Sequence, residues 1–375
     1  MKGICIPCYL FVFLFFCQTS ELLCQDRLYI DPVRKDSTIR EHKKTIYHLV
    51  QTSWDANQAP SYASLAPYVS SIDTRRIPLV QGEGANSNFD VLEANLNLNF
   101  PLFFGRESGT GLAKRHRLDF DYNGNFRMSL DDSKPILPGS HKVGFSWYIN
   151  LYNNYTGSFF ADDETKAKIN ATAENLKFYN ATIRVHHYSN GQAPGFFYPS
   201  DSLPPIQRRN AYSNGDFSTN YIYVACTKGW YNKVSLSLHQ LSLGYRTDLG
   251  TETSIFAYSQ QQENSYGRHR LLASYDYRTN RFGMKKDWHV RTEVGYILGN
   301  LDNFIPNLAN DTNKYRLSAR GLIEFSPKAH RAIGYMFFLY YGRDYLNIRY
   351  DDIVVSAQFG VTLRIDKFFM PKLRD

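Results

Sequence analysis

The chain has 375 residues, long enough for one large β domain or two smaller ones, and its formal net charge at pH 7 is +8. The basic residues are scattered through turns and strand ends, and the start of the chain is typical of an exported protein. The charge therefore favours an anionic membrane surface as partner and argues against nucleic acid. Beyond the start, no apolar run reaches the roughly 18 residues that a transmembrane helix needs, which excludes ordinary membrane-spanning helices. An aromatic content of 15% and a mean hydropathy of −0.42 leave a membrane β-barrel open, because barrel strands alternate apolar and polar residues.

Residues 1–24 are predicted to be a secretory signal peptide that is removed before Gln25. A positively charged start precedes an apolar run over residues 4–16, which is too short to span a bilayer. Four of the five cysteines lie in this segment, so the mature chain keeps Cys226 alone. A single thiol excludes an internal disulfide, and Cys226 is interpreted as a small apolar side chain.

Residues 25–84 are polar and irregular, and they are predicted to form an N-terminal periplasmic arm or plug. One stretch in this region, Ser37–Trp54, has a helical pattern that its first serine could cap. After residue 84 the pattern changes to a period of two and keeps it to the end of the chain. Residues 85–375 are therefore predicted to form a β-barrel.

The clearest predicted strand is EANLNLNFPLFF, at residues 93–104. Its leucines and phenylalanine at even positions share one face and its asparagines the other, which is the apolar-out, polar-in pattern of a barrel wall. Similar runs follow as far as residue 363, and with two weaker runs near Ser254 and Tyr315 they number about twelve, an even number as bacterial barrels require. A soluble β-sandwich also alternates, but its strands are commonly about five or six residues long, whereas many of these runs reach about ten. The predicted fold class is an all-β, transmembrane antiparallel β-barrel.

The segment ATIRVHHYSNGQ, residues 181–192, combines strand alternation with reactive side chains. Ile183 and Val185 share a face with His187 and Ser189, and these apolar members mark the face as the lipid side. A histidine and a serine two residues apart on a strand lie side by side. The imidazole can therefore act as the base that a serine hydroxyl needs to become a nucleophile.

The next predicted strand, DFSTNYIYVACTKGW, brings a third polar group to the same surface. Asn220 shares a face with Ile222 and Val224, so it points outward from the strand expected to pair with the first. Polar groups that face hydrocarbon carry a desolvation cost, and this cost favours a functional role for them. Such residues near strand ends also occur as ordinary interfacial groups. By the same alternation, His186 and Arg184 point into the lumen and are interpreted as structural polar filling.

The run HYSNG at residues 187–191, followed by Asn220, resembles the H-x-S-N-G motif and downstream asparagine of the outer-membrane phospholipase A family (phosphatidylcholine 1-acylhydrolase). The segments EANLNLNFPLF and GRDYLNIRYDDIVVSAQFGVTL are similar to the early and closing strands of that family, so the similarity covers most of residues 89–369. The resemblance implies that Ser189 is the nucleophile, His187 the general base and Asn220 the residue that orients the imidazole. A neutral asparagine suits this role, because its carbonyl accepts from Nδ1–H without placing a charge at the membrane face.

The resemblance also implies Ca²⁺ as cofactor and a homodimer as the active assembly. The Gly191 amide would help to hold the oxyanion, and Asp216, the Gln192 carbonyl and Ser133 stand where the family has metal ligands. Gln192 departs from the family, which has an arginine there. A carboxylate at position 216 would be a harder and stronger oxygen donor than the serine of the family.

The segment between the nucleophile and the orienting asparagine is much longer than in the family. It carries Asn210 and Asn214 as rival orienters, although neither falls in the outward register. The function that the resemblance implies is calcium-dependent hydrolysis of the acyl esters of membrane phospholipids at the outer membrane. Two alternatives stay open: a lipid A deacylase-like esterase, whose family combines H-x-S-N with a glutamate orienter, and a non-catalytic outer-membrane channel or structural barrel.

Overall fold

The computed structural model describes residues 54, 60–65, 68–71, 90–104, 116–129, 136–153, 157–158, 175–190, 217–232, 237–249, 266–279, 286–299, 301, 316–327, 333–347 and 353–363. Among these residues, no helix is long and apolar enough to cross a membrane. The strands are β1 (Ser61–Leu65), β2 (Tyr68–Ser71), β3 (Asp90–Phe104), β4 (His116–Ser129), β5 (Ile136–Asn153), β6 (Gly157–Ser158), β7 (Asn175–Ser189), β8 (Ser218–Asn232), β9 (Ser237–Leu249), β10 (His269–Thr279), β11 (Lys286–Leu298), β12 (Leu317–Pro327), β13 (Ile333–Arg343) and β14 (Ile353–Leu363).

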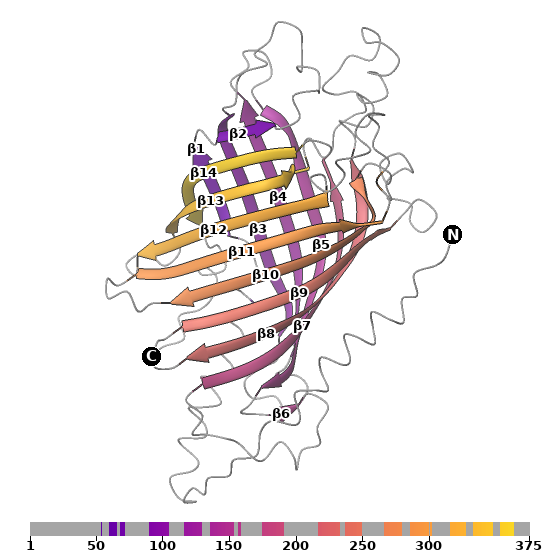
Figure 1. Ribbon diagram of the computed structural model, residues 1–375, viewed down its shortest axis with the longest axis vertical. Coiled ribbons are helices and arrows are strands. Elements are labelled where there is room, and N and C mark those ends of the chain that lie inside the picture. Colours follow the sequence, from indigo (N-terminus) through magenta and orange to yellow (C-terminus); the bar gives the residue numbers. More distant parts are fainter. Residues whose placement is uncertain are drawn as a thin grey trace, which may run out of the picture. The chain divides into compact units, whose positions relative to one another are not determined.

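These strands form one antiparallel sheet that closes on itself (Figure 1). From β3 to β14 each strand pairs with the next along the chain, except that the short β6 adds to β5 outside this path. At the seam, β1 pairs with both β3 and β14, and β2 continues along β14, so β1 and β2 together act as one wall strand. The wall is a closed barrel of 12 antiparallel strands, which confirms the predicted fold class.

The wall begins earlier in the chain than the sequence pattern indicates. The residues of β1 and β2 fall within the span 25–84 that was expected to be an arm or plug, yet β1 is hydrogen-bonded to wall strands on both sides. With five residues, β1 is too short to show a clear period of two. The seam also depends on a glycine, because a Cβ at Gly360 would lie 2.4 Å from the Ala63 carbonyl oxygen.

The two weaker runs of the sequence pattern have different outcomes. The run near Ser254 lies outside the described residues. The run near Tyr315 corresponds to β12, whose first described strand residue is Leu317. The described wall has twelve strands, as predicted, and one of them is the strand formed by β1 and β2, which the sequence pattern did not predict.

The polarity of the wall is the reverse of that of a soluble protein. Large apolar side chains face outward, as in Leu243 and Phe359, which are both 62% exposed. Polar side chains fill the interior, where Gln240 and Asp248 are fully buried. An apolar surface surrounding a polar lumen is stable when the surface contacts lipid tails, so this alternation is that of a membrane-spanning barrel.

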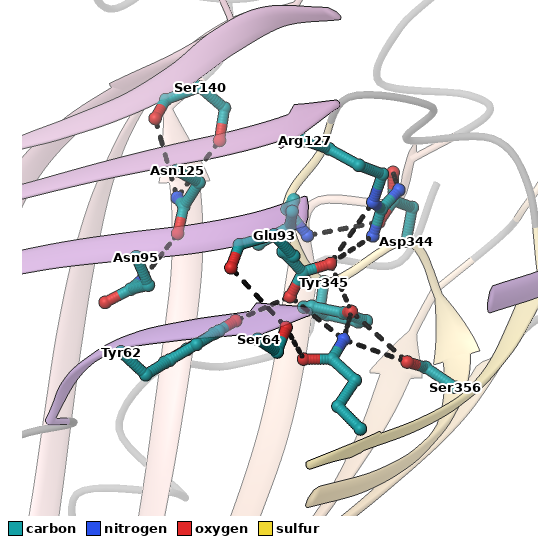
Figure 2. Close-up of polar contacts among 12 residues, drawn as sticks. Tyr62, Ser64, Glu93, Asn95, Asn125, Arg127, Ser140, Asp344, Tyr345 and Ser356 are labelled. Carbon is teal, nitrogen blue, oxygen red and sulfur yellow. Dashed lines mark hydrogen bonds and ion pairs between the residues drawn. The ribbon is translucent and has the colours of Figure 1, made fainter. Parts of the chain in front are cut away.

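A network of buried charges joins the seam strands from inside the lumen (Figure 2). The Arg127 guanidinium on β4 lies 3.0 Å from the Glu93 carboxylate on β3 and 3.3 Å from Asp344, which follows β13. Tyr345 donates to Glu93 at 2.7 Å, and Gln358 on β14 donates to it at 3.0 Å. Because each of these buried charges has hydrogen-bonding partners, the network holds β3, β4 and β14 together.

Candidate active site on the outer wall

The predicted site lies at the paired ends of β7 and β8. His187 on β7 is the register partner of Asn220 on β8, and Ser189 is the partner of Ser218. Val185, two residues before His187, is 51% exposed, whereas the side chain of His186 is 5% exposed. The alternation therefore places His187, Ser189 and Asn220 on the outer face, in the register that the sequence indicates.

The imidazole of His187 is held by the amide of Asn220. The distance between His187 Nδ1 and Asn220 Oδ1 is 2.9 Å, and both side chains are partly buried. A carbonyl oxygen can only accept, so Nδ1–H donates and the lone pair of the neutral ring resides on Nε2. Ser189 follows two residues later on the same face of β7. A hydrogen bond between a catalytic base and its nucleophile commonly tightens only when a substrate is bound.

The histidine that precedes the motif, His186, points into the lumen. His186 Nδ1 lies 2.8 Å from the Tyr221 hydroxyl, and Nε2 lies 3.1 Å from Asp121. Asp121 also accepts a short hydrogen bond from Ser146. Nearby, the Arg184 guanidinium lies over the ring of Tyr223. These contacts satisfy His186 inside the barrel, which agrees with its interpretation as structural filling.

Asn190 is a residue of the motif whose contacts the sequence pattern did not reveal. Its backbone N–H donates to the Phe217 carbonyl at 3.0 Å, and its side-chain Oδ1 accepts from the Phe217 N–H at 3.0 Å. Its Nδ2 donates to the carbonyl of Asn347, in the turn between β13 and β14, at 3.1 Å. Asn347 in turn donates to the Tyr266 hydroxyl at 3.1 Å. Asn190 thus extends the β7–β8 pairing by one step beyond Ser189 and ties it to the opposite part of the wall.

Replacing Asn190 with alanine is expected to lower the free energy of unfolding by about 1–3 kcal/mol, because the buried Phe217 N–H loses its acceptor. The measurement is a denaturant titration of the purified barrel in detergent, which gives the free energy of unfolding of each variant. Asn347→Gly is the matched control: it keeps the carbonyl that accepts from Asn190, and glycine suits the φ of 54° at this position. No measurable loss in Asn190→Ala would show that the side chain of Asn190 does not make the stabilising contact.

The remaining predicted residues lie outside the described part of the chain. These are the oxyanion candidate Gly191 and the candidate calcium ligands Asp216, Gln192 and Ser133. Within the described residues, no group of three His, Cys, Asp or Glu side chains could hold a metal ion.

Comparisons with known proteins give matches among solved structures. No family model and no curated protein matches the sequence. The chain is similar to outer membrane phospholipase A from Escherichia coli, with 13% identity and a TM-score of 0.47, over 83% of this chain and 96% of that one. The dimer of the Salmonella typhi outer membrane phospholipase with bound calcium gives 13% identity and a TM-score of 0.47, over 82% and 92%. A porin of Rhodopseudomonas blastica gives 7% identity and a TM-score of 0.25, over 81% and 98%.

Proposed function

We propose that this protein is an outer-membrane acyl hydrolase that cleaves the acyl esters of glycerophospholipids at Ser189. The observation that carries the proposal is the 2.9 Å contact between His187 Nδ1 and Asn220 Oδ1 on the outer face of the barrel, with Ser189 two residues after His187 on the same face of β7. A base held in one tautomer beside a hydroxyl is the arrangement that serine hydrolases need. The H-x-S-N-G motif of the sequence supports the same assignment.

The chemistry follows from these three side chains. His187 Nε2 takes the proton of the Ser189 hydroxyl while Oγ attacks the ester carbonyl carbon. The ester bond then breaks, the acyl group stays on Oγ, and the imidazolium returns the proton to the glycerol oxygen that leaves. A water molecule, deprotonated by the same nitrogen, releases the fatty acid and restores the serine. Throughout, the Asn220 carbonyl holds Nδ1–H and stabilises the imidazolium as a dipole.

The position of the site suits a substrate that arrives from the membrane. The wall around it presents apolar side chains to lipid tails, including Phe145 at 48% exposure and Val185 at 51%. A phospholipid can therefore reach Ser189 laterally from its own leaflet, with its acyl chains against the wall and its ester groups at the strand ends. The same barrel architecture supports a location in the outer membrane.

The contact to Asn220 also bears on the alternatives. A lipid A deacylase-like site would use a glutamate to orient the imidazole, whereas here an asparagine amide occupies that place. A channel or structural barrel gives no reason for a histidine and an asparagine to be joined on the lipid side, where each carries a desolvation cost.

Calcium dependence is the part of the proposal that metal removal tests directly. Purified protein in detergent micelles is expected to release fatty acid from phosphatidylcholine when Ca²⁺ is present, and to lose this activity in excess EGTA. Added Ca²⁺ should then restore it. Activity that persists in EGTA would remove calcium and its candidate ligands Asp216, Gln192 and Ser133 from the proposal, while the serine site would stand. No fatty acid release under any of these conditions would contradict the hydrolase itself.

The homodimer is proposed on the sequence resemblance, and its test is the assembly state of the protein with and without Ca²⁺.

A further inference from the structure

Ser189 has a second histidine beside it, on the strand opposite to Asn220. His141 on β5 is the register partner of Ser189, and Val143 is the partner of His187. His141 shares its face of β5 with the exposed Phe145, so its side chain belongs to the outer wall. Directly opposed residues on neighbouring strands have Cβ atoms about 4.5–5.5 Å apart. The serine is therefore flanked by two imidazoles, one from its own strand and one from the next.

Side chains of β4 hold the ring of His141 in place. Its Nδ1 lies 3.0 Å from the Tyr122 hydroxyl, and the Phe126 ring contacts it edge-on at a centroid distance of 5.9 Å. Gly124, the register partner of His141, makes room for this contact, since a Cβ there would lie 2.9 Å from the Tyr122 hydroxyl oxygen. Because Nδ1 is hydrogen-bonded to the tyrosine, Nε2 is the ring nitrogen that can bind a ligand.

The backbone that carries His141 is fixed from the lumen. Ser140, the residue before it, is fully buried, and its hydroxyl accepts from Asn125 Nδ2 at 3.1 Å (Figure 2). Asn125 Oδ1 accepts a short hydrogen bond from Asn95 on β3. These contacts join β3, β4 and β5 on the inner side of the wall, at the level where His141 faces outward. Contacts on the outer face of the sheet therefore hold the His141 ring, and contacts on the inner face hold its backbone.

The electrostatic surroundings of His141 favour a negatively charged ligand. On the described parts of β4, β5, β7 and β8, the outward alternation carries no carboxylate, because the acidic side chains of these strands point into the lumen. The partner of His141 is a neutral hydroxyl. On these described parts of the wall, an anion at Nε2 would meet no like charge, and the ring N–H could donate a hydrogen bond to it.

We propose that His141, oriented by Tyr122, binds the phosphodiester of the lipid substrate while Ser189 attacks the neighbouring acyl ester. This inference rests on the proposed function and names a specificity determinant for it. In a glycerophospholipid the phosphate is only a few bonds from the ester carbonyl, and adjacent strands are about 4.8 Å apart, so one molecule spans both side chains. His141 holds the lipid through a hydrogen bond from Nε2 to the phosphate and takes no part in the proton transfer that His187 performs.

A second histidine–tyrosine pair on the same outer wall provides the matched control. His269 Nδ1 on β10 lies 2.7 Å from the Tyr245 hydroxyl on β9, and the two rings are stacked. This pair has the same chemistry, but β8 and β9 separate β10 from β7 in the sheet. A general effect of removing an outer-wall histidine would therefore appear in both variants, whereas a contact with the substrate at Ser189 would appear in His141 alone.

The test compares His141→Gln and His269→Gln on two substrates in the same detergent: phosphatidylcholine and a diacylglycerol with the same acyl chains. His141→Gln is expected to lower kcat/KM for phosphatidylcholine by about tenfold or more, mainly through KM, because a hydrogen bond to a charged group is lost. Hydrolysis of the diacylglycerol should change by less than about twofold, which also shows that the variant is folded. For Tyr122→Phe, kcat/KM on phosphatidylcholine is expected to lie between the values of the parent protein and His141→Gln. His269→Gln should match the parent protein on both substrates.

The possible results separate the inference from the function on which it rests. Equal losses on both substrates, or no loss on either, would overturn the role of His141 while leaving the hydrolase in place. A parent protein that hydrolyses neither substrate and does not react with a fluorophosphonate at Ser189 would overturn the proposed function, and the inference with it. A tenfold loss in His269→Gln as well would show a general effect of the outer wall, which also contradicts a specific phosphate contact.

Discussion

Ser189→Ala is expected to lower kcat for phospholipid hydrolysis by about a thousandfold or more, because the acyl group then has no hydroxyl on which to form the covalent intermediate. KM should change little, since the alanine leaves the apolar wall around the site intact. The measurement is fatty acid release from phosphatidylcholine micelles by matched amounts of folded protein. Ser218→Ala is the control, because Ser218 is the register partner of Ser189 and faces the same surface.

Full activity in Ser189→Ala would remove the serine from the mechanism. A large loss in Ser218→Ala with Ser189→Ala unaffected would assign the nucleophile to β8, and the base would then have to act across the strand pair. Either result would contradict the roles given to β7.

His187→Gln is expected to lower kcat by a similar factor of about a thousandfold, because the serine loses the base that takes its proton. The double variant with Ser189→Ala should be no less active than Ser189→Ala alone, since residues that act as a unit have non-additive effects. The measurement is again kcat on phosphatidylcholine, with His269→Gln as a control for an outward histidine away from the site. Losses that multiply in the double variant would show that the two side chains act independently.

The local phase of the strands could be read from the sequence. Every second residue of a half-apolar strand faces the same side, so Val185 was enough to place His187 and Ser189 on the outer wall, and Ile222 was enough to place Asn220. The pairing of β7 with β8 also followed, because successive strands joined in a barrel are neighbours. The catalytic arrangement itself stays a prediction, since geometry shows contact and not turnover.

The contacts that join distant parts of the chain could not be read in this way. Asn190 and Asn347 are 157 residues apart, and Arg127 and Asp344 are 217 residues apart. No periodic pattern marks such pairs, because their meeting depends on how the barrel closes. For the same reason the sequence pattern did not predict the seam. β1 is a wall strand only because β3 and β14 lie on either side of it.

His141 illustrates an intermediate case. Its outward phase was available from the run that contains Phe145, but its position opposite Ser189 depends on the register between β5 and β7. Register is set by turns and by bulges such as the one between Asn150 and Tyr152, which shift the pairing without changing the sequence pattern. A residue that is ordinary in sequence thus becomes a neighbour of the nucleophile only in the folded wall.

The most direct measurement is reaction of the purified barrel with a fluorophosphonate, followed by mass spectrometry of the labelled peptide. This reagent modifies a serine whose hydroxyl is activated by a neighbouring base. We expect one adduct, on Ser189, that is lost in Ser189→Ala and strongly slowed in His187→Gln. An unlabelled protein, or an adduct that forms on another serine and persists in both variants, would contradict an activated serine on the lipid-facing wall.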